Sequence, residues 1–461
     1  MRNASLWPIL LCVENTVVED VEFDDEAQVL VAHVRPRRAR RGRCGTCGSR
    51  ACWYDRGQGR RRWRALDMGT TQVFLEADAP RVNCPVHGPT VRQVPWARHG
   101  AGHTRSFDQQ VAWLATQCSK SAITELMRIA WRTVAAIITR VWADTAAGID
   151  ALAGLRRVGI DEISYKRHHK YLTVVVDHDS GRLVWASPGR ERATVTAFFD
   201  ALEASGQGRC AQISHVTADG AEWIADVVSK RCPDAIRCAD PFHVVGWATE
   251  ALDAVRREAW NTARRAGHTR NHGWAHGRRA TVATGPAQAL RRARYALWKN
   301  PENLTDRQRV KLEWIAKTDP RLYRAYLLKE GLRTVFKLPA DQAAEALDRW
   351  IAWARRCRIE SFVTLQRRIV GHRAQILASI AHGLSNGLIE SVNTKIRLIT
   401  RMAFGFANPN PLIALAMLTL GGHRPALPGR QMTHGSVTRA TNVDVNLHGL
   451  MVNSPTCLPH T

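Results

Sequence analysis

The sequence lacks an apolar run long enough to cross a membrane. Leu412–Leu420 is apolar but far shorter than the roughly 20 residues that a membrane-spanning helix needs. The N-terminal apolar segment Leu6–Val13 is followed by the acidic segment Glu14–Glu26 and has no small-residue cleavage site, so we expect a first β-strand there rather than a signal peptide. We therefore expect no membrane association.

Acidic residues are scarce. The 461 residues include 41 Asp and Glu against 66 Lys and Arg, which gives a net charge of +25. This balance favours a polyanionic partner, although a basic protein from a GC-rich genome that uses arginine freely is the alternative. The 11 cysteines are odd in number and widely spread, which indicates reduced thiols, a metal site and a cytoplasmic protein rather than a disulfide framework.

Five short runs rich in β-branched residues predict β-strands in the middle of the chain. The first three are joined by short turns, whereas residues 194–205 and 221–230 have helical periodicity. The expected order is three antiparallel strands, a helix, a strand, a helix and a strand. The five runs are Arg157–Asp161, Tyr171–Asp177, Leu183–Ala186, His215–Asp219 and Ile236–Asp240.

This order of elements, with acids closing the first and fourth strands, resembles the RNase H-like catalytic core of the DDE transposases. Such a core clusters carboxylates because a pair of divalent metal ions must flank the reacting phosphodiester. Asp161 and Asp219 fit as the first two ligands. Glu162 is a substitute for Asp161, although adjacent side chains on a strand face opposite sides.

A pair of short metal-binding motifs lies nearer the N-terminus. Cys44-Gly-Thr-Cys47 and Cys84-Pro-Val-His87 together provide the three thiolates and one imidazole of a tetrahedral zinc site. The interval between them is longer than a DNA-reading finger needs and contains a strand-like segment, Gln72–Ala77, so we expect a structural zinc-ribbon-like module. Cys52, His99 and His103 are the spare candidate ligands.

Arginines surround a tryptophan on this module. Guanidinium groups next to Trp63 suit contact with phosphate, although such a charged run is more often a solvated face. The candidate DNA-contacting residues are Arg60, Arg61, Arg62 and Arg64.

Three short amphipathic helices are predicted between Ser106 and Asp144, with a break near residues 129–131. This is the layout of a helix-turn-helix, whose last helix enters the major groove of DNA. Arg132 and Thr133 would face the bases and Arg140 would lie near the backbone. Many small helical bundles share the same pattern.

Residues 246–385 are almost entirely helical in pattern and predict an insertion in the core, or else a separate helical domain. Residues 263–279 lack periodicity and indicate a mobile basic loop. A new helix follows Ser385-Asn-Gly387, and one of its faces carries Glu390, Asn393, Thr394 and Arg397. Glu390 is the candidate for a third metal ligand, or else an ordinary surface acid.

Taken together, these segments resemble the insertion-sequence L-three (ISL) family of bacterial DDE transposases. The matching stretches are Gly159–Ile163, Tyr171–Asp177, Ala239–Val244 and Ser385–Asn393. The resemblance implies cut-and-paste DNA transposition at terminal inverted repeats, with Mg²⁺ or Mn²⁺ held by the three acids, structural Zn²⁺, double-stranded DNA as partner, and a nucleoid-associated homo-oligomer on that DNA.

The second catalytic acid remains open between Asp219 and Asp240. Asp219 is preferred because it closes the fourth strand, which lies next to the first in this fold. Asp240 and His243 resemble an accessory Asp-x-x-His motif of related transposases.

Two other functions fit the same motifs. One is a DNA-binding regulator that carries an inactive nuclease-like domain, and the other is a nuclease that cuts without strand transfer.

The expected fold is α/β, an RNase H-like core with a large α-helical insertion. The expected segments are the zinc module (1–100), the helix-turn-helix (101–150), the core (156–245), the insertion (246–385), the closing core helix (386–424) and a loose tail (425–461).

Overall fold

The computed structural model describes residues 3–166, 170–218, 221–270 and 285–430. These residues form two compact units, which are considered separately. The first holds the described residues up to Trp113 and those from Pro425, and the second runs from Leu114 to Arg424.

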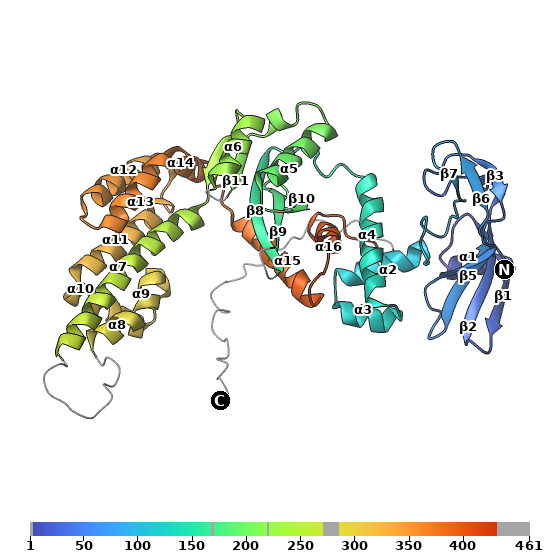
Figure 1. Cartoon of the computed structure of the whole chain (residues 1–461), viewed down its shortest axis with the longest axis horizontal. Coiled ribbons are helices and arrows are strands. Elements are labelled where there is room, and N and C mark those ends of the chain that lie inside the picture. Colours follow the sequence, from blue (N-terminus) through green and yellow to red (C-terminus); the bar gives the residue numbers. More distant parts are fainter. Residues whose placement is uncertain (1–2, 167–169, 219–220, 271–284, 431–461) are drawn as a thin grey trace, which may run out of the picture. The chain divides into compact units, whose positions relative to one another are not determined.

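The first unit contains two small sheets (Figure 1). Four strands pair in the order β1-β2-β5-β4, and three pair in the order β3-β6-β7. Trp63 and Trp96 meet edge to face at 5.5 Å in the core of this unit, where both are 2% exposed. The strands are β1 (Thr16–Asp24), β2 (Val29–Pro36), β3 (Cys52–Asp55), β4 (Arg60–Arg64), β5 (Gln72–Asp78), β6 (Arg81–Cys84) and β7 (Gly88–Val91).

The strand expected over Leu6–Val13 is wrong. A helix, α1 (Asn3–Leu10), occupies most of this segment. Trp7 packs partly and Leu11 and Val13 pack fully into the core beneath the four-stranded sheet. An apolar run this short does not distinguish a helix from a strand by its periodicity, and the packing of these side chains decides.

Three helices follow where the sequence predicts them: α2 (Arg105–Ala115), α3 (Lys120–Met127) and α4 (Trp131–Ala147). The Ser119 hydroxyl accepts a hydrogen bond from the Ala122 amide at 3.2 Å and so caps the start of α3. Arg128, with φ of +52°, ends α3 in the left-handed region and makes the tight turn into α4.

The central sheet of the second unit has the strand order β10-β9-β8-β11-β12. Strands β8, β9 and β10 are antiparallel, and β11 runs parallel to both β8 and β12, which confirms the predicted element order. The elements are β8 (Arg157–Lys166), β9 (Lys170–Asp177), β10 (Leu183–Pro188), α5 (Arg192–Ser205), β11 (His215–Ala218), α6 (Glu222–Arg231) and β12 (Ile236–Ala239).

Helices cover both faces of this sheet (Figure 1). Val158 and Ile160 of β8 pack on one face against apolar residues of α5 and α6, including Phe198. On the other face lies α15 (Gly387–Met402), followed by α16 (Pro409–Leu420), which packs on α4. The first strand does not end at Asp161 as the sequence suggested, because β8 continues to Lys166.

The remaining helices share a separate core that includes Leu252, Trp350 and Phe362. The basic loop expected over 263–279 is partly wrong, since residues 263–270 continue helix α7 and residues 271–284 lie outside the described chain. The helices are α7 (Pro241–Arg270), α8 (Pro286–Arg292), α9 (Arg294–Trp298), α10 (Asp306–Thr318), α11 (Pro320–Val335), α12 (Ala340–Arg356), α13 (Glu360–Gly371) and α14 (Arg373–His382).

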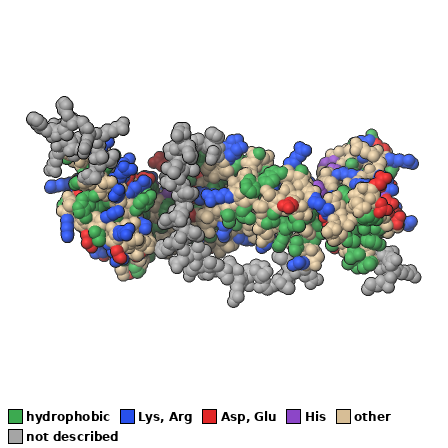
Figure 2. All heavy atoms as spheres, turned by 90° about the horizontal axis from the view of Figure 1, so that it is seen from below, with side chains coloured by type: hydrophobic (Ala, Val, Ile, Leu, Met, Phe, Trp, Pro, Cys, Tyr) green, Lys and Arg blue, Asp and Glu red, His purple; other side chains and the backbone are tan. Residues whose placement is uncertain are grey.

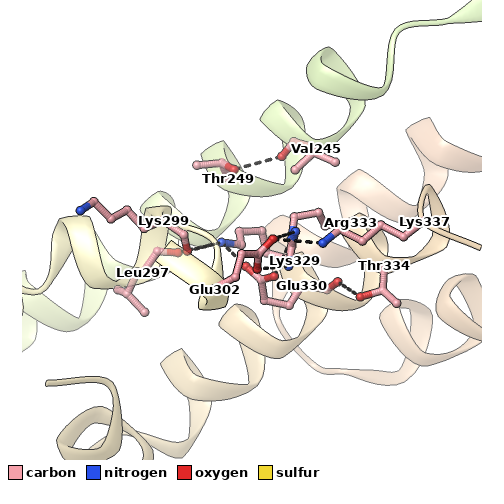
Figure 3. Close-up of polar contacts among 10 residues, drawn as sticks. All are labelled: Val245, Thr249, Leu297, Lys299, Glu302, Lys329, Glu330, Arg333, Thr334 and Lys337. Atoms are coloured by element: carbon pink, nitrogen blue, oxygen red, sulfur yellow. Dashed lines mark hydrogen bonds and ion pairs between the residues drawn. The ribbon is translucent and has the colours of Figure 1, made fainter. Parts of the chain in front are cut away.

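A buried lysine links α11 to the end of α9 (Figure 3). Lys329 of α11 is 1% exposed and donates to the Leu297 carbonyl at the end of α9 at 3.0 Å. Burial lowers its pKa, and an ion pair with Glu330 at 2.5 Å opposes that shift. A terminal carbonyl of α9 thus receives a charged donor in place of water.

None of the helices in the described part of the chain is both long and apolar enough to span a membrane.

Candidate functional site

The first candidate site is a cluster of four metal-binding side chains. Cys44, Cys47, Cys84 and His87 place one ligand atom each within 4.8 Å of all the others. The Sγ atoms of Cys47 and Cys84 lie 3.7 Å apart, and Cys44 Sγ lies 3.7 Å from Nδ1 of His87. A tetrahedron with metal to sulfur bonds of about 2.3 Å has edges of about this length, so the donor set fits Zn²⁺.

Local backbone geometry brings the two halves of this cluster together. Cys84 ends β6 and His87 precedes β7, so one tight hairpin turn supplies two ligands. In the other half, a Cβ on Gly45 would lie 2.3 Å from Nδ1 of His99 and 2.4 Å from the oxygen of the Val91 carbonyl, so only glycine fits at position 45. Hydrogen bonds from the side chain and backbone of Ser49 lower the pKa of Cys47 to about 6, which favours the thiolate.

The spare candidates Cys52, His99 and His103 are outside this group of four. Cys52 is exposed at the start of β3, and the His103 ring stacks on Phe107 at 5.0 Å. In the described part of the chain every cysteine is free of a disulfide.

The arginines of β4 differ in how far their side chains are buried and paired within the first unit. Arg60 and Arg62 pair with Glu76 at 2.8 and 2.6 Å and remain about half exposed. Arg64 is 7% exposed, pairs with Asp67 and lies over the Phe74 ring at 5.5 Å. The guanidinium of Arg64 therefore stabilises the fold, a role that the run of basic residues did not indicate.

The predicted DNA-facing residues lie near the start of α4. Arg132, the second residue of this helix, is exposed, whereas Thr133 and Arg140 are half-buried. On the face drawn in Figure 2, Lys and Arg side chains are spread over the surface and Asp and Glu are fewer, as the composition requires. A helix that presents arginine in a basic environment suits a duplex phosphate backbone.

The second candidate site is a cavity of about 400 Å³ beside the middle of β8 and the start of β9, where α15 packs on both strands. It brings together two of the predicted acids, Asp161 and Glu390, with His243. Its lining residues are Asp161, Glu162, Tyr171, Arg190, His243, Glu390, Asn393, Thr394 and Arg397.

A glycine allows α15 to approach the sheet at this cavity. A Cβ on Gly159 would lie 2.7 Å from Cδ1 of Ile389, 2.9 Å from Nε2 of His178 and 3.0 Å from Oγ1 of Thr217. His178 and Thr217 are themselves hydrogen-bonded at 2.8 Å and cannot easily move aside. The absence of a side chain at position 159 thus sets how closely Glu390, next to Ile389, approaches Asp161.

The two acids of the cavity are held in different ways. Asp161 accepts from Nδ2 of Asn393 at 2.8 Å and from the Glu162 amide at 2.7 Å. Glu390 is exposed, yet partial burial raises its pKa, and the negative charges of Asp240 and Asp161 raise it further. Carboxylates that oppose one another's ionisation in this way, with further oxygen donors nearby, fit a hard divalent cation.

Asp240 lies beside this cavity rather than on its wall. It is 3% exposed, and its two oxygens accept from Nδ1 of His243 at 2.7 Å and from the Asn386 amide at 3.2 Å. Burial by itself would raise the pKa of Asp240, but these hydrogen bonds outweigh it and the pKa is lowered. Asp240 therefore anchors both His243 and the start of α15.

Sequence reasoning missed one of the two arginines that line the cavity. Arg190, two residues after β10, pairs with Glu162 and lies over the Tyr171 ring at 4.9 Å. Its place four residues after the predicted strand Leu183–Ala186 was the only signal. Asn393 was noticed on the same helix face as Glu390, but nothing in the sequence assigned it to Asp161.

Asp219, the preferred second acid, lies outside the described residues. The strand before it, β11, pairs in parallel with β8 in the register Ala218↔Ile160. This confirms the predicted adjacency of the fourth and first strands, while the role of Asp219 stays a prediction.

Comparison with known proteins identifies the family. Residues 158–416 match the family described as "Transposase", the ISL3 type that carries a DDE domain. Residues 92–142 match the "Helix-turn-helix domain of transposase family ISL3", and residues 40–87 match the "zinc-finger of transposase IS204/IS1001/IS1096/IS1165". The chain belongs to the ISL3 family of transposases.

Two relatives agree with this assignment. The chain is 65% identical over 440 residues to "Transposase for insertion sequence element IS1557" of Mycobacterium tuberculosis (strain CDC 1551 / Oshkosh), covering 93% of this chain and 98% of that protein. It is 26% identical over 350 residues to "Transposase for insertion sequence element IS1001" of Bordetella parapertussis, covering 75% and 81%.

Among solved structures, the "Drosophila P element transposase strand transfer complex" aligns with a TM-score of 0.34 and 10% identity over 69% of this chain and 92% of that one, too low to support an argument. The family and the IS1557 relative make this chain a transposase of an insertion sequence, with a helix-turn-helix and a DDE transposase domain. The zinc-finger match and the Cys₃His cluster agree on structural zinc, and membership of a DDE family implies a divalent metal.

Proposed function

We propose that this ISL3 transposase binds the terminal inverted repeats of its own element and cuts and joins DNA at the cavity that holds Asp161 and Glu390. The observation that carries the proposal is the meeting of these two acids, from β8 and from the first turn of α15, in one cavity. Carboxylates repel a phosphodiester unless a divalent cation lies between them, whereas the basic chain, with a net charge of +25, attracts one.

Asp161, Asp219 and Glu390 are the proposed ligands of Mg²⁺ or Mn²⁺. Bound there, the metal would lower the pKa of the attacking water or 3′-hydroxyl and stabilise the leaving oxygen. Asn393 holds Asp161 in place, and Arg190 and Arg397 put positive charge at the cavity where phosphate would enter. Asp240 is 3% exposed and is not among the residues that line the cavity, which supports Asp219 as the second ligand.

The proposed fold of the catalytic part is an RNase H-like core in two pieces, residues 156–245 and 386–424, with residues 246–385 as a helical insertion. Support comes from the packing of α15 on β8, which unites pieces separated by the insertion. Residues 1–100 would be the zinc-binding module, 101–150 the helix-turn-helix and 425–461 a tail.

The remaining contacts with DNA are proposed from charge and exposure. Arg132 and Thr133 would read bases, while Arg140, Arg60, Arg61 and Arg62 would contact phosphates; Arg64 is not included because its guanidinium is buried. The enzyme would act as a homo-oligomer on DNA, since two element ends must be joined, and at the nucleoid, where its substrate lies.

A plasmid assay tests the function. Supercoiled plasmid that carries both element ends is incubated with the protein and Mg²⁺, and the products are separated on a gel. Excision with joining of the ends is expected. Nicking alone would indicate a nuclease, and binding without any cleavage would indicate a regulator with an inactive core.

A further inference from the structure

The turn that ends α15 presents an aromatic side chain to solvent. Phe404 is 75% exposed, whereas Phe406, two residues later, is 8% exposed and faces Lys120. The φ of Phe404 is +53°, in the left-handed region that a bulky L-residue rarely adopts. The chain thus keeps a large apolar side chain pointing outward at a position that glycine would occupy without strain, and such strain is a reason to look for function.

Phe404 stands next to the start of the predicted DNA-reading helix. Its ring lies 6.2 Å from the ring of Trp131, the first residue of α4, which is itself 40% exposed. Lys120 Nζ lies 4.5 Å from the centre of the Trp131 ring. Trp131 is therefore fixed in place by Lys120 and supports Phe404.

The charges around this pair favour nucleic acid over an apolar protein surface. Exposed Arg132 follows Trp131, and exposed Arg401 is the next-to-last residue of α15. Glu390, Arg397 and Arg401 are spaced by seven and four residues, so they share one face of α15. A duplex that follows this face would pass from the acid cavity to Phe404.

We propose that Phe404, supported by Trp131, inserts at a base step of the element's end DNA between the cleavage site and the segment held by the helix-turn-helix. Exposed apolar wedges next to phosphate-binding arginines partially unstack a base step in this way. The proposal rests on the proposed function, because it requires that the cavity of Asp161 and Glu390 cuts DNA.

The position of the wedge on DNA follows from the helix. Because α15 rises about 1.5 Å per residue, the 12 steps from Glu390 to Met402 span about 18 Å. That length corresponds to roughly five or six base steps of about 3.4 Å. The unstacked step is therefore expected about five or six base pairs from the cleaved phosphate.

Phe404→Gly is the informative substitution. It removes the apolar wedge and relieves the strain of the left-handed backbone. Because the side chain of Phe404 buries little apolar surface, the melting temperature should stay unchanged or rise by about 1–3 °C. Phe404→Asn is a second variant, because Asn also tolerates the left-handed region. Phe404→Trp should restore the contact. Phe23→Ala is the matched control, since Phe23 is 47% exposed on β1, a strand rich in acidic residues.

The probe is a duplex of the element's terminal repeat with 2-aminopurine at successive positions near the cleavage site, bound in Ca²⁺. The wild type and Phe404→Trp should give a fluorescence increase about five or six base pairs from that site. Phe404→Gly and Phe404→Asn should lose the increase and bind roughly tenfold more weakly, the scale of one stacked base. Phe23→Ala should behave as the wild type.

Unchanged affinity and fluorescence in the Phe404 variants would overturn the proposal. It would equally be overturned if these variants reduced self-association in sedimentation experiments and left DNA binding intact, because the pair would then contact a second copy of the chain. If the wild type itself neither prefers nor cleaves end DNA, the proposed function has failed and the wedge with it.

Discussion

The zinc cluster and the acid cavity are assembled over very different distances along the chain. Cys44 and His87 are 43 positions apart, and a hairpin turn and a single knuckle supply all four zinc ligands. Asp161 and Asn393 are 232 positions apart and meet only because α15 packs on β8. When turns bring the ligands together, the spacing of those residues in the sequence predicts the site. When a helix must pack on a sheet to form the site, the site also depends on every residue that permits that packing.

The two sites also differ in charge. Within the zinc cluster, Cys47 has thiolate character before any metal is considered, since hydrogen bonds from Ser49 lower its pKa to about 6. The pKa of Cys84 is raised instead. In the acid cavity the carboxylates oppose one another, and the pKa of Glu390 is raised. We therefore expect the zinc site to serve folding and the acid site to serve chemistry.

The largest effect is expected from neutralising the acids. Asp161→Asn, Asp219→Asn and Glu390→Gln keep side-chain shape and remove a charge, so each should lower strand cleavage by about 10³-fold or more, a loss at or above that of one charge-stabilising group. Gel assays of end-DNA cleavage in Mg²⁺ measure this. Binding to end DNA in Ca²⁺ should stay within a few-fold of the parent, and retained cleavage in any of the three would remove that residue from the ligand set.

Removing a zinc ligand should affect the first unit, which holds the zinc cluster. Cys47→Ser is expected to lose stoichiometric zinc and to bind end DNA poorly, while the second unit keeps its fold, because the metal stabilises only the turns that hold it. Metal analysis and circular dichroism check this. Cys52→Ser, outside the cluster of four, is the matched control and should retain zinc; unchanged zinc in Cys47→Ser would contradict the assignment.

These differences explain what could be predicted from the sequence. The zinc ligands and the strands of the central sheet follow from spacing and periodicity, which are local. The helix over Asn3–Leu10 was missed because a short apolar run fits either structure. Arg64 looked like a phosphate contact, yet Asp67 and Phe74 enclose it, and only tertiary packing determines that.

The acid cavity was predictable in part. Glu390 was the candidate third metal ligand, on a helix face that it shares with Asn393, Thr394 and Arg397, and α15 does pack on β8. The dependence of that packing on Gly159 was not visible, since a glycine within a strand has several explanations. Arg190 was missed for a similar reason, because its pairing with Glu162 depends on how β9 and β10 bring the two side chains together.

Gly159→Ala tests that dependence. The new Cβ would lie 2.7 Å from Cδ1 of Ile389, and overpacking of this kind costs about 1–3 kcal/mol. We expect a lower melting temperature and a loss of cleavage that exceeds the loss of DNA binding. Adding Ile389→Val, which removes Cδ1, should restore part of both. Cleavage at the parent rate in Gly159→Ala would show that the approach of α15 is less restricted than the contacts indicate.

A smaller effect is expected at Asp240 and His243. We expect these residues to hold side chains of the cavity in position rather than to bind the metal. Asp240→Asn and His243→Ala should therefore slow turnover by about 10–100-fold and leave metal-dependent cleavage detectable. Single-turnover cleavage measures both. If Asp240→Asn were as inactive as Asp161→Asn while Asp219→Asn kept its activity, Asp240 would replace Asp219 as the second ligand.

The smallest effect concerns the coupling of pH, metal and stability at Glu390. Partial burial and the charges of Asp240 and Asp161 raise the pKa of Glu390 above its ordinary value of 4.5. For an acid shifted upward, the stabilising contribution is complete below the unfolded pKa and is lost as the pH rises through the folded pKa. A divalent cation binds the ionised form and so offsets this loss. Mg²⁺ should therefore raise the melting temperature at neutral pH, and the increase should fade as the pH falls below the raised pKa. In Glu390→Gln the increase should be smaller and less dependent on pH, and an unaltered response in scanning calorimetry would argue against Glu390 as a metal ligand.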